Sequence, residues 1–290
     1  MINIVFVCTG NTCRSPMAEG LMKKLLADRG IDTFNITSAG LAAYPGDEVS
    51  EKSVIAARRY GVDISAHRAR RISEYMLSDS VFVCMTASHA QALIPYLDEN
   101  RLFVLGGGVA DPYGGTQETY DLCAEQINGA LPDLLAQIVK SNTAITAMDE
   151  KHISRIAQIE AECFSVPWSE TSLRQELENE NAHFLTALLG DAVTGYIGVI
   201  EICGEADITN VAVDTRFRRF GIGEKLLKSA EQGAISRNCE SITLEVRISN
   251  EAAISLYEKS GYEKVGIRKG FYEKPTEDAL LMTKYFSKDN

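Results

Sequence analysis

The segment from Cys8 to Ser15, Cys-Thr-Gly-Asn-Thr-Cys-Arg-Ser, holds residue types that can act together on a phosphate group. A thiolate attacks phosphorus as a nucleophile, and an arginine grips two phosphoryl oxygens at once. A tight turn between a strand and a helix directs several backbone N–H groups inward, where they bind a tetrahedral anion. These donors also favour the charged form of a cysteine. We therefore predict that Cys8 is a nucleophile and that Arg14 clamps the phosphate.

A displacement at phosphorus also needs an acid for the leaving group, and the turn-rich run 111–115 (Asp-Pro-Tyr-Gly-Gly) offers Asp111. Taken alone, an Asp-Pro pair is more often a plain turn, and a cysteine is more often a packed core residue. The neighbouring Arg14, Ser15 and Pro16 favour the catalytic interpretation of Cys8. The other loop residues expected to bind the phosphate are Thr9, Gly10, Asn11, Thr12, Cys13 and Ser15.

A second group of residues could transfer an acyl group to an amine. Arg218-x-x-Gly221-x-Gly223 stands between an expected strand and an expected helix, where glycines let the backbone approach a pyrophosphate. Further along the chain, Glu245 could take a proton from an amine, and Tyr257 could give one to a leaving thiolate. Each signal alone is weak. A glycine-rich turn, a solvent-facing carboxylate and a core tyrosine would produce the same residues.

Hydrophobic patterning predicts the elements that position the first group. The expected strands are 2–7, 34–38, 80–85 and 102–105. The expected helices are 15–29, 48–60, 88–97 and 117–140. Ser15 is the expected N-cap of the first helix, and Gly30 is expected to end it. Strands that alternate with helices in this way predict a doubly wound, mainly parallel sheet.

The second half of the chain has a different order of expected helices and strands. The sequence is small, polar and aperiodic from Ser141 to Met148, so we place the boundary there and expect domains 1–142 and 143–290. The expected helices are 149–162, 168–179, 221–236 and 250–260. The expected strands are 192–202, 205–213, 241–247 and one that ends at the hairpin turn Gly190-Asp191. Asn250 is the expected cap of the last helix, and no internal repeat links the two halves.

Composition limits the partners that we expect. The 290 residues include 40 acidic and 29 basic ones, for a net charge of −11, which disfavours nucleic acid and anionic lipid. We find no apolar run long enough for a membrane span and no signal peptide. The seven cysteines are scattered and the four histidines do not cluster, so we expect no disulfide framework, no metal and a cytoplasmic location. The basic cluster around His67 and Arg70 is expected to be a solvated face.

The first half of the chain resembles the low-molecular-weight protein tyrosine phosphatase family over nearly its whole length. The resemblance rests on residues 7–19 and on the Asp-Pro pair at 111–112. It implies a parallel α/β fold and a phosphocysteine intermediate formed on Cys8. It also implies that Ser15 stabilises the thiolate, that Asn11 organises the loop and that Asp111 is the general acid.

Two positions depart from the tyrosine-directed members of that family. Thr12 stands where they usually carry an aliphatic residue, and Gly114 stands where they carry a second aromatic one. Those residues wall a slot for a phenyl ring, so their replacement suits a polar, branched leaving group. The pattern resembles the bacterial protein arginine phosphatases, and we favour phosphoarginine over phosphotyrosine as the substrate.

Cysteines other than Cys8 leave two further options open. An arsenate reductase on the same scaffold needs two additional cysteines, and Gln91 stands where the partner of Cys84 would be required. Cys13 lies in the same loop as Cys8. Either peroxide joins these two sulfurs reversibly, since an ionised thiolate oxidises readily, or Cys13 merely packs under the loop.

The second half of the chain resembles the GNAT acetyltransferases, and within them the bacterial ribosomal-protein alanine N-acetyltransferases. The order of the residues described above carries the resemblance, together with segments 164–169, 208–213 and 277–279. It implies a mixed-sheet domain in which Glu245 is the base and Tyr257 the acid. The residues expected to bind acetyl-CoA are Val211, Ala212, Val213, Arg218, Arg219, Phe220, Gly221, Ile222, Gly223 and Asn250. Segment 268–272 departs from relatives that often carry two tyrosines there.

We therefore expect an α/β protein with a parallel-sheet domain followed by a mixed-sheet domain. The main hypothesis is a fusion of two enzymes, a cysteine-dependent protein phosphatase and an acetyl-CoA-dependent N-α-acetyltransferase. The expected substrates are phosphorylated proteins and the N-terminal alanine of a ribosomal protein. Alternatives remain open: a phosphotyrosine phosphatase, a regulatory domain that binds acetyl-CoA without turnover, and a GNAT with a different substrate.

Overall fold

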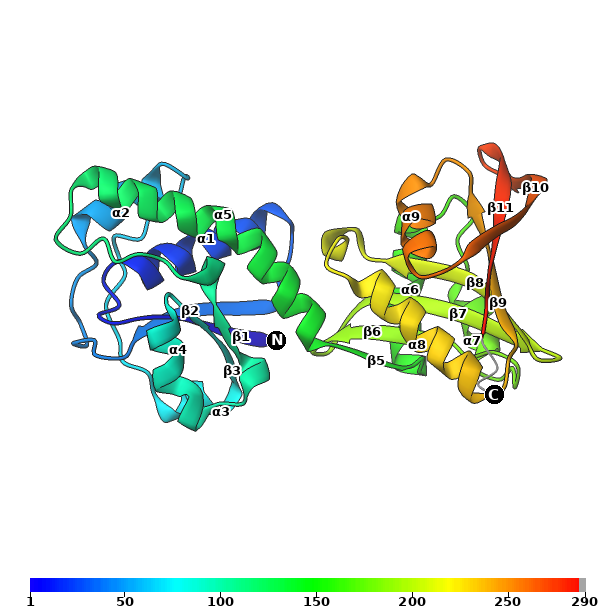
Figure 1. The fold of residues 1–290 in the computed structure, drawn as a ribbon, viewed down its shortest axis with the longest axis horizontal. Coiled ribbons are helices and arrows are strands. Elements are labelled where there is room, and N and C mark those ends of the chain that lie inside the picture. The colour runs from blue at the N-terminus through cyan, green and yellow to red at the C-terminus, as the bar shows by residue number, and fades with distance from the viewer. Residues whose placement is uncertain (287–290) are drawn as a thin grey trace. The chain divides into compact units, whose positions relative to one another are not determined.

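The computed structural model describes residues 1–286, which fall into two compact units (Figure 1). Unit 1 spans Met1–Ser141, and unit 2 begins at Asn142. Within the described residues, no helix is both long and apolar enough to span a membrane.

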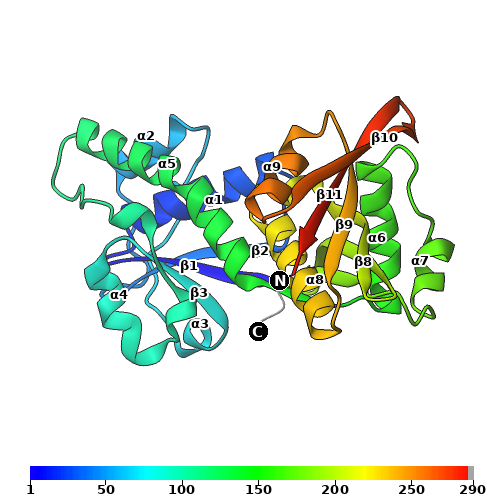
Figure 2. The same cartoon turned by 45° about the vertical axis from the view of Figure 1, so that its right-hand side comes forward.

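Unit 1 is a four-stranded sheet in the order β2-β1-β3-β4, and every pairing is parallel. Helices α1 and α5 lie on one face, and α3 and α4 lie on the other (Figures 1 and 2). The strands are β1 (Ile2–Cys8), β2 (Phe34–Gly40), β3 (Ser80–Cys84) and β4 (Leu102–Val104). The helices are α1 (Arg14–Asp28), α2 (Glu51–Arg58), α3 (Glu74–Asp79), α4 (Ala87–Leu93) and α5 (Gln117–Asn142), with 3₁₀ turns at Ile94–Tyr96, Glu99–Arg101 and Leu105–Gly107.

The predicted doubly wound parallel sheet is confirmed, and β1 and β3 are buried, apolar runs because helices cover both faces. The expected cap of the first helix is wrong. Cys13 occupies the N-cap position, α1 begins at Arg14, and Ser15 lies in the first turn. The Ser15 hydroxyl is instead within hydrogen-bond distance of the Cys8 sulfur. Gly30 follows the helix with a left-handed φ of 65°, as expected of a residue that ends it.

Unit 2 is a mixed seven-stranded sheet in the order β10-β11-β9-β8-β7-β6-β5, in which β8 and β9 are parallel and the other pairs antiparallel. The strands are β5 (Thr143–Ala147), β6 (Leu185–Leu189), β7 (Ala192–Ile202), β8 (Glu205–Val213), β9 (Ser241–Arg247), β10 (Glu263–Glu273) and β11 (Thr276–Tyr285). The helices are α6 (Glu150–Cys163), α7 (Glu170–Glu176), α8 (Ile222–Ser236) and α9 (Glu251–Lys259), with a 3₁₀ turn at Thr215–Phe217. The predicted mixed-sheet domain is confirmed.

Two strands of unit 2, β5 and β10, are absent from the expected elements. The aperiodic stretch 141–148, where we place the boundary, is largely regular, because α5 runs to Asn142 and β5 begins at the next residue. Segment 268–272 is part of β10. Both strands lie at edges of the sheet and are largely exposed, so they lack the apolar alternation that would have revealed them.

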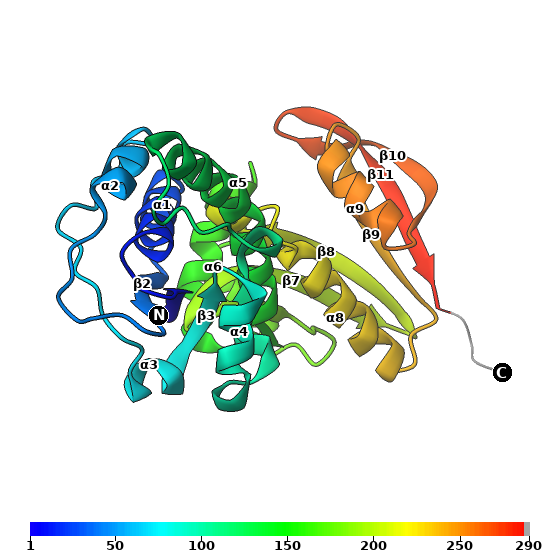
Figure 3. The same ribbon diagram turned by 60° about the vertical axis from the view of Figure 1, so that its left-hand side comes forward.

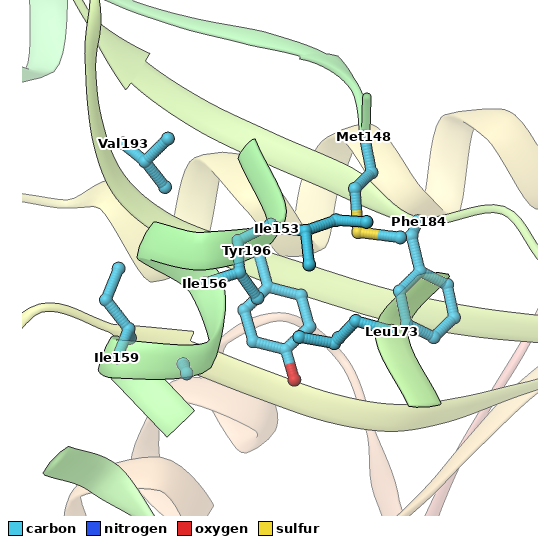
Figure 4. Close-up of a cluster of buried hydrophobic side chains, with 9 residues drawn as sticks. Met148, Ile153, Ile156, Ile159, Leu173, Phe184, Val193 and Tyr196 are labelled. Carbon is cyan, nitrogen blue, oxygen red and sulfur yellow. The ribbon is translucent and has the colours of Figure 1, made fainter. Parts of the chain in front are cut away.

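A cluster of apolar side chains fixes α6 on the sheet of unit 2 (Figure 4). Ile153, Ile156 and Ile159 follow the helical period and are at most 1% exposed. They pack around the ring of Tyr196 from β7, whose hydroxyl emerges at one side of the cluster (Figure 4). This packing places the C-terminal end of α6 against β7 and β8.

Candidate active sites

Cys8 is the last residue of β1, and its side chain is buried at the base of the loop that leads to α1. Its Sγ atom lies 3.0 Å from Ser15 Oγ and accepts the backbone N–H of Asn11 at 3.2 Å. The structure thus brings together the residues expected to form and hold the nucleophile.

Asn11 braces the loop from within. It has a left-handed φ of 57°, and its Nδ2 donates to Ser15 Oγ and to Ser38 Oγ, both at 2.9 Å. Its Oδ1 accepts the backbone N–H of Arg70 at 2.9 Å and lies 3.2 Å from His67 Nε2. A left-handed non-glycine residue persists only where its surroundings hold it, and here four contacts do so. This geometry is what an organiser of the loop requires.

His67 is therefore not part of a solvated face, which corrects the expectation for this residue, whereas Arg68 and Arg71 are exposed as expected. The His67 side chain is 8% exposed, and its Nε2 lies 3.2 Å from both the backbone oxygen and Oδ1 of Asn11. Burial lowers the pKa of His67, although the nearby Glu19 carboxylate acts in the opposite direction. Charge patterning alone could not reveal this role, because it treats a histidine beside arginines as surface.

The backbone of the loop is held from β2 and from the start of α2. The N–H of Ala42 donates to Thr9 O, and that of Ser50 donates to Thr12 O, both at 2.9 Å. Gly40 lies so close that a Cβ atom there would stand 2.6 Å from Thr9 O. A glycine at this position lets β2 pack directly against the loop.

Arg14 links the loop to the candidate acid. Its Nη2 donates to Asp111 Oδ2 at 2.6 Å, and its Nη1 donates to the backbone oxygen of Val109 at 3.1 Å. The arginine is 4% exposed, whereas the Asp111 side chain is 51% exposed. Arg14 Nε is buried without a hydrogen-bond partner among the described residues, so a donor remains for an oxyanion. Arg14 and Asp111, which are far apart in sequence, thus lie in contact.

The remaining loop residues surround this arrangement. Gly10 and Thr12 are half-buried, and Cys13 is 6% exposed. Cys13 Sγ lies 3.6 Å from Tyr120 OH, a contact that fits a cysteine packed under the loop. A reversible bond between Cys13 and Cys8 stays a prediction.

Two further cysteines of unit 1, Cys84 and Cys123, have thiols of low reactivity. Burial raises the pKa of Cys84 and of Cys123 to about 12 in each case. Cys84 lies in the apolar core at the end of β3. A buried neutral thiol is a poor nucleophile, so Cys84 is unsuited to resolve an arsenate intermediate.

In unit 2 the strands β8 and β9 pair only over their first residues. Their parallel register ends at Ile208 and Leu244, after which the two strands diverge (Figure 3). The register of β8 with β7 also slips at Thr209, as in a β-bulge. Val211, Ala212 and Val213, all expected to bind acetyl-CoA, lie in the part of β8 that has no partner strand on the β9 side.

The loop expected to cradle the pyrophosphate ends at the start of α8. Gly221 is the N-cap residue with a left-handed φ of 79°, and Arg219 is left-handed as well. The side chains of Phe220 and Ile222 are buried and anchor the loop in the core. A Cβ atom on Gly223 would contact Leu256 at 3.4 Å.

These residues fit acetyl-CoA. The backbone of the loop lies at a helix N-terminus, where N–H groups attract phosphates. Arg218 lies at the same end, donating from Nε to Val213 O and from Nη2 to Cys163 Sγ, both at 3.2 Å. Asn250 is the N-cap of α9, as expected, and its Oδ1 accepts the N–H of Ala253. Its side chain therefore has a structural task in addition to any role in binding.

Glu245 lies in β9 just beyond the point of divergence. Its Oε1 accepts a hydrogen bond from Arg268 Nη1 at 3.1 Å, and its backbone oxygen accepts one from Tyr272 OH at 3.2 Å. Burial, together with the charge of Glu245, raises the pKa of Asp207. The candidate base thus shares its surroundings with a cation from β10 and a second carboxyl group.

Tyr257 projects from α9 and is 7% exposed. Burial raises the pKa of its hydroxyl, and the hydroxyl of Tyr272 acts in the same direction. Tyr272 also contacts the backbone of Glu245, so it connects the candidate acid with the candidate base. The phenol keeps its proton near neutral pH, as a general acid must.

Glu160 is a buried carboxyl group that the sequence analysis did not single out. It is fully buried near the C-terminal end of α6 and accepts hydrogen bonds from Tyr196 OH, from Asn210 Nδ2 at 3.0 Å and from the backbone N–H of Trp168 at 2.8 Å. Burial raises the pKa of its carboxyl group. It ties β8 at the bulge to segment 164–169. In sequence, a glutamate in a helix looks like an exposed residue, so no pattern singled out Glu160.

Within residues 1–286, no group of three or more His, Cys, Asp or Glu side chains is arranged to hold a metal ion.

Comparison with known proteins assigns the two halves of the chain to two different families. Residues 3–144 match the low molecular weight phosphotyrosine protein phosphatase family, and residues 153–262 match the acetyltransferase (GNAT) family. The putative [ribosomal protein bS18]-alanine N-acetyltransferase of Bacillus subtilis is 37% identical over 50% of this chain and 96% of that protein.

Two phosphatases are similar to the first half. The low molecular weight protein-tyrosine-phosphatase PtpB of Staphylococcus haemolyticus is 38% identical over 43% of this chain and 92% of that protein. The protein-arginine-phosphatase of Bacillus subtilis is 33% identical over 48% of this chain and 95% of that protein. Each half of the chain thus corresponds to a nearly complete separate protein.

Proposed function

Because the first half of the chain belongs to the low molecular weight phosphotyrosine protein phosphatase family and the second to the GNAT acetyltransferase family, we propose that two active sites share one polypeptide. Both families are enzymes, and GNAT proteins use acetyl-CoA. We assign protein phosphatase activity to residues 1–142 and N-α-acetyltransferase activity to residues 143–290. The first assignment rests on two contacts. Cys8 Sγ lies beside Ser15 Oγ, and Arg14 pairs with Asp111.

The phosphatase reaction follows from the contacts of the loop. The Cys8 thiolate attacks phosphorus, a P–S bond forms, and the bond from phosphorus to the leaving group breaks. Asp111 gives its proton to that leaving group, while Arg14 and the loop N–H groups stabilise the charge on the phosphoryl oxygens. Water then attacks the phosphocysteine, Asp111 takes a proton from it, and the thiolate leaves with the Ser15 hydroxyl beside it.

We infer that phosphoarginine is preferred to phosphotyrosine. Thr12 and Gly114 remove walls that a phenyl ring would use, and Asp111, once it has given its proton, is a carboxylate that can pair with the departing guanidinium. The relatives include phosphatases of both kinds, so identity alone does not decide the substrate. The polarity of these side chains supports the inference.

A substrate comparison tests the preference. We expect kcat/KM for a phosphoarginine peptide to exceed that for the matched phosphotyrosine peptide by about tenfold or more. Thr12→Ile is the matched variant and should move the ratio toward phosphotyrosine, because it replaces a hydroxyl by an apolar wall. A wild-type preference for phosphotyrosine would overturn the inference and leave the phosphatase assignment in place.

The acetyl transfer is assigned to the divergent ends of β8 and β9. Acetyl-CoA supplies an activated thioester, and the candidate residues for holding it are Val211–Val213, the backbone of 218–223 and Asn250. An α-amino group is partly protonated at neutral pH, so Glu245 takes its proton directly or through water. The nitrogen attacks the thioester carbon, the C–S bond breaks, and Tyr257 protonates the leaving thiolate. We propose the N-terminal alanine of a ribosomal protein as the acceptor, as the name of the similar Bacillus protein suggests.

Glu245→Gln tests the acetyl transfer. We expect the rate of acetylation of an alanine-initiated ribosomal peptide, measured by the release of free CoA, to fall by about 10²–10⁴-fold, since the variant cannot accept a proton. Acetyl-CoA binding should change little. Glu263→Gln, an exposed position on β10, is the control and should retain full activity. Binding of acetyl-CoA by wild type without its consumption would favour the alternative, a regulatory domain.

A further inference from the structure

His89 is a buried histidine next to the phosphate-binding loop that the proposed mechanism does not use. It is 6% exposed and lies in α4. This helix begins just after β3, at the carboxyl ends of the parallel strands, where the loop that follows β1 also lies. Its Nε2 stands 3.0 Å from Thr9 Oγ1 in that loop. Its Nδ1 stands 2.6 Å from Thr86 Oγ1, the N-cap of α4. Both ring nitrogens therefore face a hydroxyl group.

The surroundings of His89 favour the neutral imidazole. Burial lowers the pKa of His89, the charge of Arg14 lowers it further, and Asp111 acts in the opposite direction. A neutral imidazole donates from one nitrogen and accepts at the other. If Thr86 donates to Nδ1, then Nε2–H donates to Thr9, and the Thr9 hydroxyl can direct its own proton to a bound anion. The reverse arrangement holds the same Thr9 oxygen.

Thr9 is the residue directly after Cys8, and its backbone oxygen is already held by the Ala42 N–H at 2.9 Å. The contact with His89 holds its side chain from a separate element, α4. Two anchors of different origin leave little freedom for the peptide units beside Cys8. Small rotations of those units would turn N–H donors away from the phosphoryl oxygens, where their stabilisation of the transition state is largest.

We propose that His89 is a positioning residue for phosphoryl transfer, which acts by holding the Thr9 hydroxyl and thereby the first turn of the anion-binding loop. This inference rests on the phosphatase activity proposed above. His89 touches neither Cys8 nor a reacting atom and acts through Thr9. The chemistry that it serves is binding of a tetrahedral dianion and of the transition state derived from it.

A double-mutant cycle tests the proposal. His89→Ala and Thr9→Val should each lower kcat/KM by about tenfold, the size expected for the loss of one positioning hydrogen bond. The double variant should be no worse than the poorer single variant, because both changes remove the same contact. His89→Gln, whose amide can reach Thr9, should restore activity to within about threefold of wild type. A merely structural histidine would give additive losses and no rescue by glutamine.

Two measurements keep the test decisive. Thermal unfolding reports whether a variant has simply lost its fold, and acetyltransferase activity is an internal standard for the amount of enzyme in the sample. Ser73→Ala removes an N-cap from α3 in the same unit, far from the loop in its contacts, and should leave kcat/KM unchanged. The affinity for inorganic phosphate, measured by calorimetry, reports on the loop independently of turnover and should weaken in both single variants.

Failure of the proposed phosphatase activity and failure of the His89 role give different results. Wild type that binds phosphate but hydrolyses no phosphopeptide would refute the proposed function, while phosphate affinity would still report on His89. Full activity and phosphate affinity in folded His89→Ala would overturn the positioning role alone. Additive losses in the double variant would do the same.

Discussion

Replacing Cys8 by serine is expected to abolish phosphatase turnover, with a loss of at least about four orders of magnitude in kcat. The loop and its contacts would remain, but an alcohol next to Ser15 and the Asn11 N–H is not ionised at neutral pH and attacks phosphorus poorly. The loss should be measured with the better phosphopeptide under initial-rate conditions. Acetyl transfer by the same sample should be unchanged.

The control for Cys8→Ser is Cys203→Ser, because Cys203 is an exposed cysteine of unit 2. That variant should keep both activities. A Cys8→Ser enzyme that retained even a tenth of wild-type turnover would exclude the thiolate mechanism. Phosphate binding should survive the substitution, which would separate loss of chemistry from loss of the loop.

Arg14→Lys is expected to lower kcat/KM for the phosphatase by about 10³-fold, a loss within the range seen when arginine clamps are removed from phosphoryl-transfer enzymes. Lysine keeps the charge but cannot occupy the positions from which Nη1, Nη2 and Nε serve Val109, Asp111 and a phosphoryl oxygen. Because these contacts form one fork, a single ammonium replaces only one of them.

The matched control is Arg58→Lys, since Arg58 makes an exposed ion pair with Asp63 and should tolerate the change. Initial rates over a range of substrate concentrations separate the effects on kcat and KM. If Arg14→Lys retained near-wild-type kcat/KM, the guanidinium contacts of Arg14 would be excluded as a main source of transition-state stabilisation.

The sequence was most informative where one local signal sufficed. The buried apolar run of β1, followed by the loop and by Pro16 at the start of α1, predicted the element order, and it singled out Cys8 as the candidate nucleophile. The contact of Arg14 with Asp111 has no local signal, because these residues are separated by most of unit 1. Turn residues such as Gly30 marked the helix ends correctly.

The misses share a physical cause: they depend on tertiary contacts rather than on local pattern. His67 and His89 look like surface residues in sequence and become loop supports only when distant segments pack beside Asn11 and Thr9. Glu160 is stable inside unit 2 because three donors from separate segments reach it. The edge strands β5 and β10 lack one neighbour each, so their residues carry little apolar alternation.

The direct passage from α5 into β5 bears on how the two halves can be separated by protein engineering. β5 pairs along its whole length with β6, from Thr143–Leu189 to Ala147–Leu185. A fragment that started at Met148 would therefore expose the N–H and C=O groups of β6 as a new sheet border. Such a border recruits strands from other molecules and leads to aggregation. A separately produced acetyltransferase half must keep Thr143 and the residues that follow it.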